Sequence, residues 1–570
     1  MTRDELIDFL YDPDTVDFVV RESDFFREFI KDRPEIITTM TLAGRYTITY
    51  IDRLYINRLF DDLGASFKAA IPLVCGLLDR ASLDAAGIIQ VQQQPFLDLR
   101  GSGVIVGIVD TGIDYTQKAF QYEDGTSKIL YIFDQSIRGT PPEGFLLGEE
   151  YTKEEIDIAL KSENPFQIVP STDTVGHGTF LASIAAGRED PENPDFIGAA
   201  PDSELIVVKL KTARPFTREN FLIPPEQENA FESSAIMVGV EYIVRKAQQL
   251  NRPVAICLGL GTNSGGHDGF TFFEEYLSLI ATQSGVCLCS AAGNEVEARH
   301  HTQVVLEESG DVKIIEVSVG ENAGSIYMNM YNDASDRISV AVRSPTGELV
   351  GRFPAKSATF YESKLVLERS TVIVSYFFPL EGSGAQVTNI RIIDATPGVW
   401  QIIVNGDIVL DGIVHTWLPI TGFVSPNVEF INPMPNYTVV TPSTAIGVIT
   451  CGAYNAITNS LYPRRSWGPT RLPMMSPDFV APGVNVGGVY PTGYGTMDGT
   501  SVSAAIATGA CALLLQWGVV EGNEPNMSTF QARAYIIRGC SREENLTYPN
   551  TQWGYGKLNL INTFNLMREQ

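Results

Sequence analysis

Apolar runs with the character of strands alternate with helix-like segments between about residues 80 and 300. The strand-like runs are apolar on both faces and lie at residues 104–109, 205–210, 254–260 and 286–292. The segments at 234–250 and 272–282 have helical periodicity. Buried strands separated by helices indicate a parallel sheet that is covered on both faces. We therefore predict an α/β fold for this part of the chain.

Short strand-like runs of a different kind fill residues 301–439. They lie at residues 312–317, 338–342, 364–378, 387–393, 400–404 and 408–414. Turn signals such as Pro345-Thr346-Gly347 and Asn405-Gly406-Asp407 separate them. This pattern is typical of an antiparallel sandwich or jelly roll. We predict an inserted all-β jelly-roll domain at 301–439, with the α/β domain comprising 81–300 and 440–570. The sequence leaves open whether the insert docks a partner or is only a solubilising addition.

The first residues of the chain form a third pattern. Leu6, Phe9 and Leu10 fit a short helix, residues 45–51 alternate as a half-buried strand, and residues 56–63 return to helical spacing. This predicts a small α+β unit at 1–80, with its end between residues 75 and 90. It contains no candidate catalytic group.

Composition narrows the class of protein. A chain of 570 residues with a net charge of −27 argues against nucleic acid or an anionic membrane as partner. The seven cysteines lie in apolar runs without metal-ligand spacing, as in reduced intracellular proteins. The acidic N-terminus lacks an apolar signal core, and no run reads as long enough to span a bilayer. We expect a protein made in the cytoplasm, without signal peptide or transmembrane segment.

Polar residues flanked by glycine follow the predicted strands or begin helices. They occur in Asp110-Thr111-Gly112, Gly176-His177-Gly178-Thr179, Ala291-Ala292-Gly293-Asn294 and Gly499-Thr500-Ser501. Each alone fits an ordinary turn or helix cap. Functional loops gather at the carboxyl ends of parallel strands, however, so together these residues indicate an acid–base–nucleophile relay.

The order Asp, His, Asn, Ser with these motifs resembles the subtilisin-like serine proteases, or subtilases. The resemblance implies Ser501 as nucleophile, His177 as general base, Asp110 as its orienting carboxylate and Asn294 as oxyanion donor. It also implies a substrate-binding edge, namely Gly259, Leu260 and Gly261 with Ala291, Ala292 and Gly293. Four positions depart from the usual family residues, namely Phe180, Gly259, Ala505 and Ile506.

Within the subtilases, the sequence resembles the clostridial spore germination proteases, the Csp group. This resemblance rests on three features, namely the short N-terminal unit, the insert between Asn294 and Ser501, and the loop at 261–269. His267 in that loop is interpreted as a structural hydrogen-bonding residue. The resemblance implies a prodomain that is cut autocatalytically near Arg80 and stays in the active-site cleft. It further implies limited proteolysis of a spore-cortex hydrolase precursor, with packaging of the enzyme in the spore.

Two alternatives remain open from sequence. One is a general-purpose intracellular or secreted subtilase, and the other is a catalytically silent scaffold or germination-signalling member of the Csp group. A silent member is expected to lack one of the three relay residues, and all three are present. Calcium is common in subtilases, but no dense Asp/Asn/Gly loop favours a site here, so we expect no cofactor.

Overall fold

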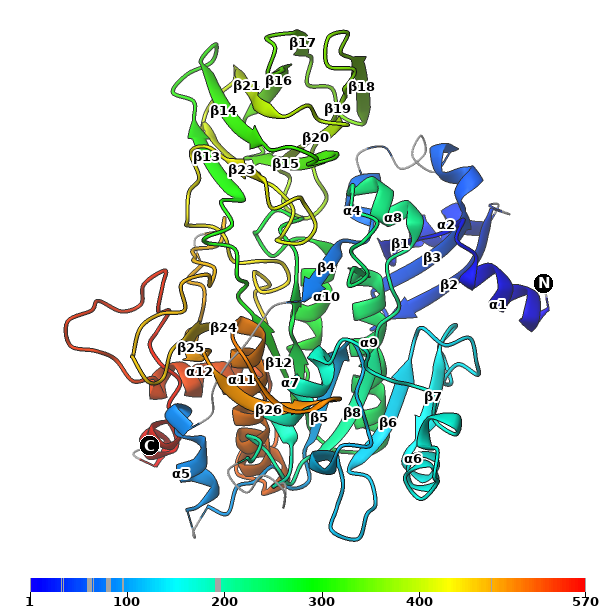
Figure 1. Ribbon diagram of the computed structural model, residues 1–570, viewed down its shortest axis with the longest axis vertical. Helices are drawn as coiled ribbons and strands as arrows, with labels where there is room; N and C mark the ends of the chain where they lie inside the picture. Colours follow the sequence, from blue (N-terminus) through cyan, green and yellow to red (C-terminus); the bar gives the residue numbers. More distant parts are fainter. Residues whose placement is uncertain are drawn as a thin grey trace.

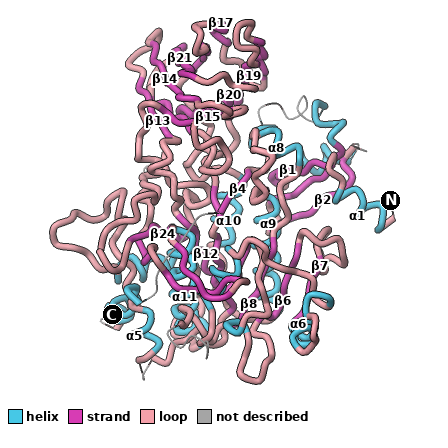
Figure 2. Tube along the Cα trace, in the orientation of Figure 1, coloured by secondary structure: helices cyan, strands magenta, loops and turns pink. Residues whose placement is uncertain are grey.

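The chain folds into three parts that meet near the centre of the molecule (Figure 1). The computed structural model describes residues 2–568 except 32, 34, 59–63, 65, 78–83, 95–96, 190–195 and 473. A large α/β domain occupies the lower half of Figure 1, the N-terminal unit lies at the upper right, and the β-rich insert stands on top. Long loops connect the insert to the α/β domain (Figure 2).

The α/β domain is built on one eight-stranded sheet in the order β25-β24-β12-β10-β5-β8-β6-β7. Its strands are β5 (Ile105–Asp110), β6 (Ile129–Asp134), β7 (Glu149–Thr152), β8 (Glu204–Lys209), β10 (Val254–Leu258), β12 (Val286–Ala291), β24 (Ile449–Tyr454) and β25 (Phe479–Pro482). All neighbours are parallel except β6 and β7. The predicted parallel sheet is therefore confirmed, with one antiparallel edge strand.

Helices cover both faces of this sheet. They are α5 (Ile88–Gln92), α6 (Lys153–Leu160), α7 (His177–Ala186), α9 (Ser233–Gln249), α10 (Phe272–Ile280), α11 (Thr500–Leu515), α12 (Thr529–Gly539) and α13 (Leu560–Met567). Helix α8 (Pro215–Asn220) lies instead beside the insert. Strand β5 shows the two-sided burial, because Val106 and Ile108 join the apolar cluster of α7 and α11 while Ile105 and Val109 join that of α9 and α10. A short hairpin of β26 (Val486–Tyr490) and β27 (Gly493–Met497) packs near α7.

Helix α11 is apolar on every side, and all of its residues are buried. Together with a π-helical turn at Gln516–Val520 it forms the described helix whose length and mean hydropathy of 1.6 would suffice to cross a membrane. The sequence analysis, in contrast, found no run long enough to span a bilayer. The same window is 89% buried inside the α/β domain, so the apolar character is that of a core helix.

The N-terminal unit is an α+β layer. Its antiparallel sheet has the order β1-β3-β2. The elements are α1 (Arg3–Tyr11), β1 (Thr15–Arg21), α2 (Asp24–Lys31), β2 (Ile36–Leu42), β3 (Tyr46–Asp52) and α4 (Ser66–Ala70). A buried ion pair joins it to the α/β domain, because Arg214 Nε donates to Asp17 Oδ1 at 2.9 Å. Part of the helical pattern predicted at 56–63 and the predicted end near Arg80 lie outside the described residues.

The insert is a sandwich of two antiparallel sheets, in the orders β13-β22-β15-β20-β19-β18 and β17-β16-β21-β14-β23. The strands are β13 (His301–Val305), β14 (Val312–Val319), β15 (Ile326–Asn332), β16 (Arg337–Arg343), β17 (Leu349–Phe353), β18 (Thr359–Lys364), β19 (Thr371–Phe377), β20 (Gln386–Ile393), β21 (Gly398–Ile408), β22 (Ile413–Trp417) and β23 (Val428–Phe430). The two sheets share one apolar core around Trp400.

Two local predictions in the insert were wrong. The run at 364–378 is not one strand, because Leu365 N bonds Ser370 O and the chain turns between β18 and β19. The segment Asn405-Gly406-Asp407 is not a turn but a register shift within β21, where Ile338 pairs with Gly406 and Arg337 with Ile408. Bulges and turns share residue types, and only the strand partner distinguishes them.

Candidate active site

The fold brings together the three predicted relay residues from distant parts of the chain. Asp110 is the last residue of β5, His177 is the first residue of α7, and Ser501 lies in the first turn of α11. His177 Nδ1 lies 2.8 Å from Asp110 Oδ1, and His177 Nε2 lies 3.2 Å from Ser501 Oγ. All three side chains are buried. An imidazole held in this way can take a proton from a hydroxyl on one side while a carboxylate fixes its tautomer on the other.

Close packing next to Asp110 explains the second glycine of the histidine motif, Gly178. A Cβ at Gly178 would lie 2.3 Å from the backbone oxygen of Gly112, so only glycine fits between β5 and α7. Asp110 Oδ1 also accepts a hydrogen bond from Thr111 N at 2.8 Å. Asp110 Oδ2 has no hydrogen-bond partner within the described part of the chain. The carboxylate is therefore committed to His177 through one oxygen.

Asn294 lies beside the start of α11, where the sequence predicts an oxyanion donor. Its Oδ1 accepts hydrogen bonds from Thr500 N at 3.3 Å and from Thr500 Oγ1 at 3.2 Å. Thr500 Oγ1 in turn accepts from Gly293 N at 3.1 Å. Because the amide oxygen is occupied, the amide NH2 group of Asn294 is the end left to donate to a negative oxygen near Ser501.

The predicted substrate edge pairs with a strand of the N-terminal unit. Strand β11 (Leu260–Gly261) pairs antiparallel with β4 (Val74–Leu77) of the N-terminal unit, with Gly261 opposite Gly76 and Leu260 opposite Leu77. On its other side β4 pairs antiparallel with β9 (Phe231–Glu232). A three-stranded sheet, β11-β4-β9, therefore lies at the predicted substrate edge, with β4 as its middle strand.

The second predicted edge, Ala291 to Gly293, lies at the end of β12 and is buried. The chain returning from the insert connects it to the first edge. Val440 N donates to Ala292 O at 3.0 Å, and the backbones of Thr441 and Thr262 exchange hydrogen bonds of 2.9 and 2.8 Å. Nothing in the sequence around Val440 signalled this role, because the pairing joins residues far apart in the chain.

Glu295, next to Asn294, is a further buried residue of this region that sequence reasoning missed. Its carboxylate accepts from His300 Nδ1 at 2.9 Å, from Asn263 Nδ2 at 3.3 Å and from Thr421 N at 3.1 Å. It therefore connects the oxyanion loop to the substrate-edge loop and to the insert.

His267 has the structural environment expected from sequence. Its ring nitrogens face the backbone oxygens of Val439 and Asn263, at 2.7 and 3.1 Å, and the ring stacks on Trp417. Burial lowers its pKa to about 4. The His267 imidazole is therefore a neutral, buried packing group that is not part of the relay.

The departures from the usual family residues are packing residues. Phe180 packs against Tyr490 of β26 at a ring distance of 4.8 Å, and Ala505 and Ile506 are buried in α11. Gly259 lies against His177, because a Cβ there would be 3.0 Å from His177 Cε1 and 2.5 Å from Leu181 Cδ1. Among the described residues, no three His, Cys, Asp or Glu side chains come close enough together to hold a metal ion.

Comparison with known proteins also groups this chain with the subtilases. The model of the subtilase family matches residues 101–323 and 427–556. The structure of the Clostridium perfringens CspB protease aligns over 85% of this chain and 99% of its own, with a TM-score of 0.75 and 31% identity. Curated relatives include the PII-type proteinases of Lacticaseibacillus paracasei and Lactococcus lactis subsp. cremoris, 23% and 22% identical over 459 residues. That match covers 73% of this chain but only 23% of either relative's length.

The family match includes β5, α7, β12 and α11, which carry Asp110, His177, Asn294 and Ser501. The inserted sandwich lies between the two matched segments for most of its length. The fold, the order of the motifs and the family match agree. The chain belongs to the subtilase family of serine proteases.

Proposed function

We propose that the protein is an endopeptidase in which Ser501 attacks the substrate carbonyl and His177 accepts its proton. The relay distances of 2.8 and 3.2 Å carry this proposal, because they put the hydroxyl, imidazole and carboxylate in hydrogen-bonding order. Asp110 holds the Nδ1 proton, so Nε2 faces Ser501 with its lone pair. The imidazolium formed in the first step is then stabilised by the buried carboxylate and returns its proton to the leaving amine.

In this mechanism negative charge develops on the carbonyl oxygen of the substrate. The Asn294 amide and the backbone N–H of Ser501, at the N-terminal end of α11, are the groups that receive it. Thr500 orients the amide through its two hydrogen bonds, so the donor is in place before the reaction starts. Such pre-organised donors lower the barrier because they need no rearrangement in the transition state.

The N-terminal unit acts in this proposal as a prodomain that the enzyme cuts from its own chain. Strand β4 supports it, because this strand lies in the cleft as a peptide substrate would, paired on both sides. The chain continues on the other side of residues 78–83 at Asp84 and α5, which packs near α13. The predicted cut near Arg80 lies in the segment outside the described residues.

Polar contacts support retention of the prodomain after the cut. The Arg214 guanidinium of the α/β domain donates hydrogen bonds to the Asp17 carboxylate and to the backbone oxygen of Leu10 in the N-terminal unit. Burial acts to raise the pKa of Asp17, but the charges of Lys211 and Arg214 outweigh it and lower the pKa. Tyr46 OH bonds Glu275 of α10 at 3.2 Å.

The substrate that we propose is the precursor of a spore-cortex hydrolase, which the enzyme would activate by limited proteolysis during germination. The likeness to the CspB protease over 99% of that chain supports this assignment. We also propose that the protein is synthesised in the cytoplasm and packaged in the spore. Seven buried, unpaired cysteines agree with a reducing compartment.

The deciding experiment compares the wild-type chain with Ser501→Ala by intact mass and N-terminal sequencing. We expect two fragments from the wild type, with the new N-terminus between residues 78 and 90, and one intact chain from the variant. The purified wild type is then incubated with a cortex-hydrolase precursor and with an unrelated unfolded protein. A wild type that stays intact and cleaves neither protein would refute the enzyme proposal, and equal cleavage of both would refute limited proteolysis.

A further inference from the structure

The two edges of the cleft sheet are supported very differently. Strand β11 follows β10, which is paired on both sides in the large sheet. Strand β9 has β4 as its neighbour in the cleft sheet and does not belong to the large sheet. If a substrate takes the place of β4, the peptide pairs on one side with β11, which follows a strand of the large sheet, and on the other with β9, which runs directly into helix α9.

Strand β9 is held from two sides, by α9, which follows it directly, and by the segment before it, residues 215–227, which we name the bridge. The bridge begins with α8 and closes into a compact loop, because the Arg218 guanidinium donates to the backbone oxygens of Pro224 (2.9 Å) and Gln227 (2.7 Å). The bridge holds β9 through Glu232, which is fully buried. Glu232 Oε1 accepts from Thr217 Oγ1 at 2.7 Å and from Arg214 N at 3.1 Å.

The bridge is itself fixed to the insert at three points. Gln227 Nε2 donates to the backbone oxygen of Gly422 at 3.3 Å, and Arg391 Nη2 donates to that of Glu219 at 2.8 Å. The third point is an edge-to-face contact between Phe221 and Tyr327 of β15, with ring centroids 5.4 Å apart. Two hydrogen bonds and one aromatic pair thus connect the insert to the strand that borders the cleft.

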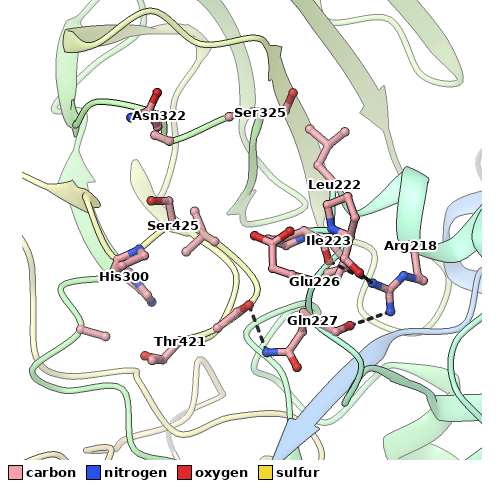
Figure 3. A pocket seen from close by; sticks show the side chains of 18 of the residues that line it. Arg218, Leu222, Ile223, Glu226, Gln227, His300, Asn322, Ser325, Thr421 and Ser425 are labelled. Carbon is pink, nitrogen blue, oxygen red and sulfur yellow. Dashed lines mark hydrogen bonds between the residues drawn. The ribbon is translucent and has the colours of Figure 1, made fainter.

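Between these points a cavity separates part of the bridge from the insert. A pocket of about 1140 Å³ lies there, with Leu222, Ile223 and Glu226 on the bridge side and Asn322, Ser325 and Ser425 on the insert side (Figure 3). Figure 3 also shows the hydrogen bond from Gln227 that spans the gap. Because the interface is open rather than closely packed, a few contacts decide where the bridge lies.

We infer that the inserted domain positions the outer edge of the substrate cleft, acting through the bridge on β9. Phe221, Gln227 and Tyr327 are then positioning residues for the subtilase reaction, and they touch neither the relay nor the oxyanion donor. The inference rests on the proposed function in one respect, namely that substrate takes the place that β4 holds here. Its consequence is that the insert increases affinity for extended peptides and does not change the chemical step.

The kinetic test uses peptide p-nitroanilides of two to eight residues with the self-cleaved enzyme, in which the peptide competes with the retained β4 for its place between β11 and β9. Wild type should show a lower KM once the peptide is long enough to pair with β9. In the Phe221→Ala/Gln227→Ala double variant we expect KM for the long peptides to rise about five- to tenfold, the size of a lost hydrogen bond and a lost aromatic contact. The value of kcat, and kcat/KM for the dipeptide, should stay within about twofold.

Val366→Ala is the matched control, because this insert residue is 81% exposed and remote from the bridge. The inference is overturned if the double variant loses activity on short and long peptides alike, or if KM for the long peptides does not change. Equal effects in the control variant would also overturn it, since they would show a general loss of stability.

A second measurement separates this inference from the proposed function. In the uncut Ser501→Ala chain, hydrogen–deuterium exchange reports the pairing of β9 and β4 without any turnover. Adding Phe221→Ala and Gln227→Ala should speed exchange in Phe231–Glu232 and in Val74–Leu77 by about five- to tenfold, while β12 stays protected. Unchanged exchange in β9 overturns the inference even if the enzyme is active. A wild type that cleaves nothing refutes the proposed function but leaves this measurement valid.

Discussion

The relay and the cleft wall differ in how they are held. Asp110, His177 and Ser501 sit at the ends of β5, α7 and α11, three elements buried in one core. The proposed cleft wall consists instead of β9 and β11, two short strands from different parts of the chain that are joined here through β4. The chemistry is thus placed by a rigid scaffold, whereas substrate binding depends on contacts between parts. Changes at the relay should abolish turnover, and changes at the wall should alter affinity and docking.

The largest effect is expected for Asp110→Asn, which breaks the relay without altering its volume. The amide can present an N–H to His177 Nδ1, which favours the tautomer that has no lone pair toward Ser501. We expect kcat to fall by about 10⁴-fold with little change in KM. The measurement is steady-state hydrolysis of a long peptide, with circular dichroism as a control for folding. A loss of less than about tenfold would mean that Asp110 does not orient His177.

The oxyanion donor should come next. Asn294→Leu removes the amide while keeping the volume, and we expect kcat to fall by about 10²–10³-fold. Thr500→Val tests the orientation of the same amide, since it removes the hydroxyl that bonds Asn294 Oδ1 at 3.2 Å. A loss of about three- to tenfold in kcat is expected there. If Thr500→Val were as severe as Asn294→Leu, the threonine would have a direct part in catalysis.

Sequence predicts the relay because its signals are local. Each polar residue follows a buried run or opens a helix, and a parallel sheet brings the carboxyl ends of such strands together. The edge at Gly259 to Gly261 is predicted by the family resemblance alone, and the strands that pair there give no local signal of this kind. Strands β9 and β11 are two residues long, and β4 pairs Cys75 with Phe231 across a long separation in sequence. Periodicity needs more residues than these strands contain, so their pairing appears only in the folded structure.

In the insert, too, features with a local sequence signal were predicted and features that depend on a distant partner were not. Its all-β character follows from composition and spacing, but the register shift at Gly406 depends on its partner Ile338 in β16. The bridge was not predicted either, because Gln227 and Arg218 look like residues of an ordinary surface loop. Their importance comes from what they bond, namely the Gly422 backbone and the carbonyls of the bridge itself.

Gly259 lies where the relay and the wall meet, so Gly259→Ser probes both. A Cβ there would come within 2.5 Å of Leu181 Cδ1 and 3.0 Å of His177 Cε1. We expect displacement of the imidazole and a fall in kcat/KM of about tenfold. Adding Leu181→Ala gives the new side chain room and should recover most of the activity. No recovery in the double variant would show that the clash with His177, and not with Leu181, dominates.

The smallest effect is a pH dependence, through Lys68 of α4, of the docking of the N-terminal unit. Its Nζ bonds Tyr327 OH at 3.1 Å and lies 5.1 Å from the Phe221 ring centroid. Burial, aided by the charge of Arg391, lowers its pKa from 10.5 to about 7. The docked state therefore disfavours the proton, so docking should tighten as pH rises from about 7 toward 10.5 and should not vary through Lys68 below pH 7.

We expect the docking equilibrium constant to rise roughly threefold between pH 7 and 9. The rise is kept this small because water reaches the partly exposed lysine and weakens the effect of burial on its pKa. The measurement is the melting temperature of the uncut Ser501→Ala chain across that range. Lys68→Met should flatten the rise and stabilise the chain at pH 7, because the apolar side chain carries no proton to lose. Lys356→Met, at an exposed lysine of the insert, should leave the profile unchanged. If Lys68→Met keeps the wild-type slope, the pH dependence belongs to other groups, and Lys68 acts in docking only through its packing against Phe221 and Tyr327.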